Sequence, residues 1–250
     1  GDVFDSVNPP AEAEKLFYQT LQQCIDAGCS GIIAIAGNHD QPERMSAAWG
    51  LAQELGVFLI GLPNQCEKFA QADFRENNGR IRLVDCGKNW LKLQLIATGE
   101  TAVFSGLPYL SEARLNEVLV EDLIAEETMQ KNYSAHIGAL WQQAITESGG
   151  SAYLQIGIGH LFTLGGVESG SERQIQLGGA LSVSKEDLPL LQYIGLGHLH
   201  GMQKVRGGDF PCYYSGSPLC YSFRETKQEK GVLLVDVSLG KPAEITFLPL

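Results

Sequence analysis

The sequence predicts an α/β fold made of short buried strands and amphipathic helices. Apolar runs alternate with helical patterns in both halves of the chain, which is typical of a sheet covered by helices. Closely spaced strands near the middle predict an antiparallel or mixed part. Polar residues directly follow several apolar strands, and open α/β sheets place their chemistry at such strand ends.

The first part of the chain predicts two helices and two strands. Pro9 and Pro10 precede the first helical pattern, because proline suits the first turn, where the amide is unpaired. Gly28 is suited to end that helix. The fully apolar strands are typical of those buried on both faces of a sheet. The predicted elements here are a helix over 11–27, a strand over 32–36, a helix over 42–55 and a strand over 57–60.

The remainder of the chain is richer in strands. Two Glu- and Gln-rich helices interrupt them, over 111–130 and 134–147, and a pair of glycines closes the second helix. The predicted strands cover 81–84, 91–97, 102–105, 153–158, 193–196, 212–215, 232–237 and 244–248.

Composition limits the classes of function. The 250 residues are enough for one large domain or two small ones. With 29 acidic and 18 basic residues the net charge is −11, which argues against a strong unaided grip on nucleic acid, although bound metal ions can invert the local field. No apolar run is long enough to predict a membrane span. Six cysteines without a Cys-x-x-Cys pair predict free thiols and a cytoplasmic location.

The histidines predict a metal site. Four of the five directly follow apolar strands that end in glycine: His39, His160, His198 and His200. Any one alone would be typical of a hydrogen-bonded structural histidine. A preceding glycine lets the backbone approach a ligand closely, and the rings of His198 and His200 point the same way on an extended strand end. Imidazoles combined with carboxylate and amide oxygens suit Mn, Fe or Zn.

Such a site suits phosphodiester hydrolysis. A carboxylate such as Asp2 can bridge two cations. Two cations about 3.5–4 Å apart clamp a phosphate and deprotonate a water between them. A histidine that titrates near neutral pH can then protonate the leaving oxygen.

Four motifs, in this order, resemble those of the calcineurin-like metallophosphoesterase superfamily: 1–5 (GDVFD), 37–40 (GNHD), 159–160 (GH) and 197–200 (GHLH). Within it the chain is similar to the SbcD family, the nuclease subunit of the bacterial SbcCD complex. Asn-Pro-Pro after the first motif, the helical insertion before His160 and the segment 214–219 carry this likeness. The resemblance spans most of the chain and implies a four-layer sandwich, with two mixed β-sheets flanked by helices.

The resemblance also implies two divalent metal ions, with Mn the first expectation and Mg, Fe or Zn as alternatives. Asp2 resembles the ligand that bridges the two ions. Asn38, His160 and His198 resemble the other ligands of one ion. His200 resembles a ligand of the second ion.

The same resemblance implies the catalytic pair. His39 resembles the histidine that contacts the scissile phosphate and protonates the leaving group, and Asp5 resembles a carboxylate that orients it. Asp5 as a simple turn carboxylate and Asp40 as a helix cap remain alternatives. The segment 214–218 is read as a structural turn near the site.

The opening Asp-x-His motif of the family, which supplies two further ligands to the second ion, does not occur before Asp2. We therefore expect residues 1–250 to form a nuclease domain without its first strand and without most of a C-terminal capping domain. A polypeptide that truly begins at Gly1 is the alternative, and would be an inactive truncated module.

The resemblance implies metal-dependent DNA phosphodiesterase activity, as a double-strand exonuclease and single-strand endonuclease in DNA repair or recombination. The resemblance implies an SbcC-like ATPase as partner, DNA as substrate and a homodimer as a further expectation. A small-molecule phosphodiesterase or a protein phosphatase of the same superfamily is the alternative.

Overall fold

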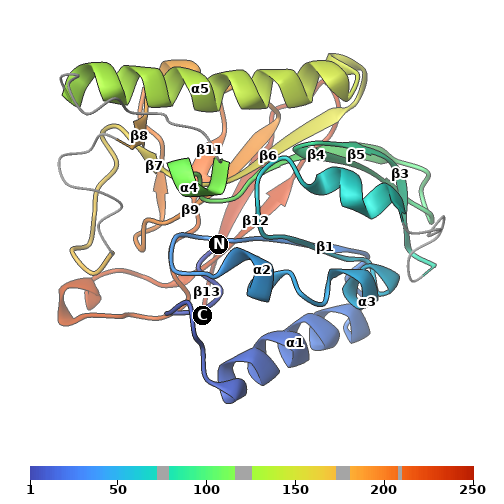
Figure 1. The fold of residues 1–250 in the computed structure, drawn as a ribbon, viewed down its shortest axis with the longest axis horizontal. Coiled ribbons are helices and arrows are strands. Elements are labelled where there is room, and N and C mark those ends of the chain that lie inside the picture. Colours follow the sequence, from blue (N-terminus) through green and yellow to red (C-terminus); the bar gives the residue numbers. More distant parts are fainter. Residues whose placement is uncertain (72–78, 116–125, 173–180, 208–209) are drawn as a thin grey trace.

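A seven-stranded mixed sheet forms the centre of the computed structural model, which describes residues 1–71, 79–115, 126–172, 181–207 and 210–250 (Figure 1). In spatial order the strands are β10 (Gln203–Lys204), β11 (Cys212–Tyr214), β9 (Tyr193–Gly197), β6 (Leu154–His160), β5 (Thr101–Leu107), β4 (Trp90–Leu95) and β3 (Ile81–Gly87). The neighbours from β11 to β5 are parallel, whereas β3, β4 and β5 pair antiparallel. The predicted antiparallel cluster is thus confirmed.

The described strands also form three two-stranded pairs. These are the parallel pair β1 (Ile32–Ile35) and β2 (Val57–Ile60), the parallel pair β7 (Phe162–Thr163) and β8 (Ser182–Val183), and the antiparallel pair β12 (Gly231–Asp236) and β13 (Glu244–Pro249). The α/β class is confirmed. A second complete mixed sheet, and with it the four-layer sandwich, stays a prediction.

The helices lie on opposite sides of the strands, with α5 on one side and α1 on the other (Figure 1). The helical elements are α1 (Ala11–Asp26), α2 (Pro42–Met45), α3 (Trp49–Glu54), α4 (Glu112–Leu115) and α5 (Glu126–Glu147), with short 3-10 turns η1 (Cys66–Gln71), η2 (Gly150–Ala152), η4 (Lys185–Asp187) and η5 (Phe223–Glu225). No helix of the described residues is long and apolar enough to cross a membrane.

Three apolar clusters fix these layers. Ile25 of α1 packs with Leu59 of β2, and Phe58 on the same strand packs with Leu91 of β4. On the other face of the sheet, Trp141 of α5 packs with Ile194 of β9. All of these side chains are buried, so both faces of the central sheet are covered by packed side chains.

Two helix predictions were wrong in their boundaries. The helix predicted over 42–55 is broken into α2 and α3, because the Ser46 hydroxyl donates to the Pro42 carbonyl and the following amides bond three residues back. The break predicted near Ser134 does not occur, and α5 runs through it. The Ser134 hydroxyl is instead engaged by Asp187 and by the amide of Ser184. Residues 116–125 of the other predicted helix lie outside the described part.

Candidate metal centre

The first residues of the chain are fixed against the loop after β1 by a buried carboxylate. Asp40 is fully buried, and its oxygens accept hydrogen bonds from the amides of Val3, Phe4 and Gly37 at 2.7–3.1 Å. The alternative that Asp40 caps a helix is wrong, since the residue before α2 is Gln41, whose side chain accepts from the Arg44 amide. Asp40 therefore positions both strand-end motifs at once.

Arg114 holds the same loop through its backbone carbonyls. Its guanidinium donates to the Gly37 carbonyl at 2.9 Å and to the Asp40 carbonyl at 2.6 Å. Sequence patterns did not indicate this residue, because nothing in its local surroundings distinguishes it from the surface charges of a polar helix. Only the tertiary fold brings it to residues 74 to 77 positions earlier in the chain.

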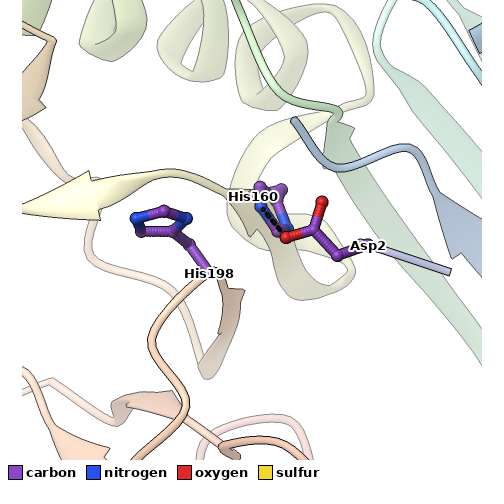
Figure 2. Close-up of side chains that lie close together, drawn as sticks. All are labelled: Asp2, His160 and His198. Atoms are coloured by element: carbon purple, nitrogen blue, oxygen red, sulfur yellow. Dashed lines mark ion pairs between the residues drawn. The ribbon is translucent and has the colours of Figure 1, made fainter. Parts of the chain in front are cut away.

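Four predicted ligands converge at the carboxyl ends of β1, β6 and β9. Asn38 Oδ1 lies 2.9 Å from His160 Nε2 and 3.3 Å from His198 Nδ1. Asp2 Oδ2 lies 3.2 Å from the same His160 nitrogen. Figure 2 shows His160 between Asp2 and His198, with their polar atoms turned toward one another. Four separate segments thus meet at the edge where parallel strands end.

Electrostatics place these groups in the states that bind metal. Burial lowers the pKa of the His198 imidazole to about 4, and repulsion from His160 adds to the shift. Burial also lowers the pKa of His160, against the opposing attraction of Asp2. Burial raises the pKa of Asp2, but the hydrogen bonds from His160 and from the His39 amide outweigh it, and the pKa falls below its usual range. At neutral pH the site holds one carboxylate and two neutral imidazoles.

The backbone at this site is strained and closely packed. Asp2 and His198 both have positive φ, 51° and 111°, a region that side chains with a Cβ rarely occupy. A Cβ at Gly37 would collide with Asp2 Oδ1, and one at Gly197 would lie 2.9 Å from His160 Nδ1. Gly37 and Gly197 are therefore required by the close approach of Asp2 and His160, whereas the approach of a ligand at these glycines stays a prediction.

These residues fit a divalent cation. One ligand atom from each of Asp2, His160 and His198 lies within 4.8 Å of the others. Carboxylate, amide and imidazole donors together match the preferences of Mn, Fe and Zn. Nδ1 of His160 is buried and has no hydrogen-bond partner among the described residues. A cavity of about 560 Å³ opens onto the carboxylate and the two imidazoles.

His39 and Asp5 line the same cavity. Nδ1 of His39 lies 3.0 Å from the Asp5 carbonyl oxygen and 3.8 Å from a carboxylate oxygen of Asp5. With its proton on Nδ1, the imidazole donates to that carbonyl, and Nε2 is left for another partner. The carbonyl of Asp5 is thus closer to the histidine than the carboxylate in which the prediction placed the orienting role.

His200 also lines the cavity but stands apart from the cluster of Asp2, His160 and His198. Its Nδ1 lies 2.8 Å from Ser171 Oγ and 3.2 Å from Glu225 Oε1. The carbonyl of His200 accepts from the amide of Ser217, so the segment after β11 contacts this loop. Tyr214, fully buried, donates to the Leu161 carbonyl and supports the end of β6.

Two curated proteins are similar to the chain over nearly all of its length. It is 38% identical over 244 residues to the SbcD component of the SbcCD nuclease from Bacillus subtilis (strain 168), covering 97% of this chain and 56% of that protein. It is 32% identical over 259 residues to the protein of the same name from Rhodobacter capsulatus, covering 100% of this chain and 58% of that protein. No protein-family model matches the chain. The chain therefore spans a little over half the length of these relatives.

Proposed function

This chain is SbcD-like along 97% of its length, and from that premise we propose that it is the nuclease part of a metal-dependent DNA phosphodiesterase that works with an SbcC-like ATPase. One observation carries the proposal. Asp2, His160 and His198 come from separate segments and line one cavity, and Asn38 Oδ1 contacts both imidazoles, so that the donors suit a divalent ion.

In this proposal Asp2, Asn38, His160 and His198 hold one ion, and Asp2 and His200 contribute to a second, with Mn²⁺ as the first choice. Such ions, when bound, polarise the phosphate and lower the pKa of a coordinated water. Asp40 and Arg114 keep the loop that carries Asn38 in place. Because the chain has a net charge of −11, most of the affinity for DNA comes from the metal ions and from the ATPase partner.

His39 supplies the proton that the leaving oxygen needs. With a proton on both ring nitrogens, Nδ1 donates to the Asp5 carbonyl and orients the ring, and Nε2 holds the proton that passes to the leaving oxygen. The substrate is DNA, cut from duplex ends or within single strands, and the role is in DNA repair or recombination. The names of the two relatives support the nuclease assignment.

The proposal is tested by cleavage of end-labelled duplex DNA in the presence of Mn²⁺, with the full-length protein and its ATPase partner. We expect His39→Ala to lower the cleavage rate by about 100-fold or more, since general acid catalysis contributes about 10²–10⁴-fold. His136→Ala, on helix α5, is the matched control and keeps the rate.

Two outcomes would contradict the proposal. Intact DNA together with hydrolysis of a simple phosphodiester, such as bis(4-nitrophenyl) phosphate, would favour a small-molecule phosphodiesterase. Equal DNA cleavage by wild type and His39→Ala would remove the general-acid role and point to a contaminating nuclease.

A further inference from the structure

A buried ion pair lies directly behind His200. Glu225, at the end of η5, is fully buried, and its two oxygens face different partners. Oε1 accepts from the Ser171 hydroxyl and lies 3.2 Å from His200 Nδ1. Oε2 lies 2.7 Å from Lys230 Nζ. A buried carboxylate is stable only with such a full set of partners.

Lys230 ties the same pair to the backbone of the histidine. Its Nζ donates to the His200 carbonyl at 2.9 Å and to Ser217 Oγ at 2.9 Å. The His200 amide in turn donates to Glu172 Oε1 at 3.0 Å. The amide, the carbonyl and the ring of one residue are therefore each held by a charged side chain. A purely structural ion pair would not need contacts to the ring.

The hydrogen-bond directions around the ring are consistent with one tautomer. Glu225 is paired with Lys230 through Oε2 and takes the Ser171 hydroxyl on Oε1, so the carboxylate only accepts. The Ser171 hydroxyl donates its hydrogen bond to Glu225. Its oxygen can therefore only accept a hydrogen bond from His200. Both neighbours of Nδ1 therefore require a proton on that nitrogen.

We propose that Glu225 and Lys230 are positioning residues that hold the imidazole of His200 as its Nδ1–H tautomer and leave Nε2 free to bind a metal ion. A carboxylate behind a ligating histidine fixes ring and tautomer in this way, and its loss typically weakens metal binding about 10–100-fold. The metal half of this inference rests on the proposed function. The tautomer half does not.

The local sequence pattern is misleading at this position. Ser222 and Glu225 match the Ser-x-x-Glu pattern that starts a helix, and Ser222 does accept from the Arg224 amide. The glutamate of that pattern would normally face its own helix end in solvent. Here one of its oxygens accepts from the Tyr221 amide, and the other faces a histidine 25 residues away in the sequence.

The test is the tautomer of His200 in the full chain without added metal, read from long-range ¹H–¹⁵N NMR spectra at pH 8. The His200→Gln variant assigns the signal among the five histidines. We expect wild-type His200 to carry its proton on Nδ1. A proton on Nε2 would overturn the proposal, and this measurement needs no variant of Glu225 to fold.

Glu225→Gln sharpens the test. The charged Lys230 should take the amide oxygen of the new side chain, and the amide NH₂ would then face His200 Nδ1 and make it an acceptor. We therefore expect the proton of His200 to move to Nε2, and Mn²⁺ titration to show about 10–100-fold weaker binding of the ion that His200 holds. Glu229→Gln, which changes an exposed neighbour, is the matched control.

The outcomes separate the two proposals. An unchanged tautomer in folded Glu225→Gln would make the ion pair merely structural, even if DNA is still cut. If the wild type does not cleave DNA, the proposed function is wrong. A His200 proton found on Nδ1 would still confirm the tautomer. Weaker Mn²⁺ binding in Glu229→Gln would show that the effect reflects surface charge.

Discussion

Asp40 accepts more hydrogen bonds from backbone amides than any candidate metal ligand does. Its carboxylate accepts hydrogen bonds from three amides, and without it the buried amides of Phe4 and Gly37 and the half-buried amide of Val3 would lose that partner. We expect Asp40→Ala to lower the free energy of unfolding by about 3 kcal/mol or more, measured by urea denaturation. Asp236→Ala, at an exposed position of β12, should change it by less than about 0.5 kcal/mol. Similar losses for both variants would contradict the role of Asp40.

Thiol reactivity gives a second prediction at the residue scale. Burial raises the pKa values of Cys66 and Cys212 to about 12, whereas Cys24, Cys29 and Cys220 are exposed. Because alkylation requires the thiolate, iodoacetamide at pH 8 should label the three exposed residues and spare the two buried ones until urea is added. Peptide mass spectrometry checks the pattern. Rapid labelling of Cys212 without urea would contradict the packing of β11.

At the scale of elements, Trp141 is one of the fully buried side chains through which α5 packs on the sheet. Trp141 is fully buried, and a Cβ on Gly159 of β6 would lie only 3.0 Å from it. We expect Trp141→Ala to lower the free energy of unfolding by about 3–5 kcal/mol, because the cavity cannot collapse against a glycine. Thermal or urea unfolding measures this loss. Gln142→Ala, one residue further on the exposed face, should be nearly neutral.

The elements show where sequence patterns suffice and where they fail. The longer strands were predicted within a few residues, because a fully apolar run such as 57–60 has few alternatives to a buried strand. The two-residue strands β7, β8 and β10 were not predicted. The helix boundaries failed at Ser46 and Ser134. A serine hydroxyl can form a hydrogen bond with a carbonyl of its own helix, cap the start of a new helix, or bond to a segment far away in the sequence. The local sequence does not distinguish these cases.

At the scale of the whole molecule, the site was predictable to the extent that its residues carry a local signal. A glycine followed by histidine at a strand end marks His160 and His198, and the fold brings them together because both strands are parallel neighbours. Arg114 and Glu225 carry no such signal. Their roles depend on contacts 25 to 77 residues away in sequence, which only the packed structure supplies.

The same convergence would make metal binding depend on the whole fold. The candidate ligands come from the first residues, the loop after β1 and the ends of two sheet strands, so an ion bound there would cross-link parts that are far apart in the chain. His160 and His198 have lowered pKa values and are neutral at pH 7.5, so no proton has to leave them when metal binds.

We therefore expect Mn²⁺ to raise the free energy of unfolding by about 2.7 kcal/mol when its concentration is 100 times the dissociation constant. Chelation with EDTA should reverse the rise, and His198→Ala should abolish most of it. His136→Ala removes the same chemical group from α5 and should keep the full metal-dependent increase, whatever its own stability. Urea unfolding with and without Mn²⁺ measures each case. An unchanged increase in His198→Ala would place the stabilising ion elsewhere and would separate the fold of this nuclease-like chain from its candidate metal centre.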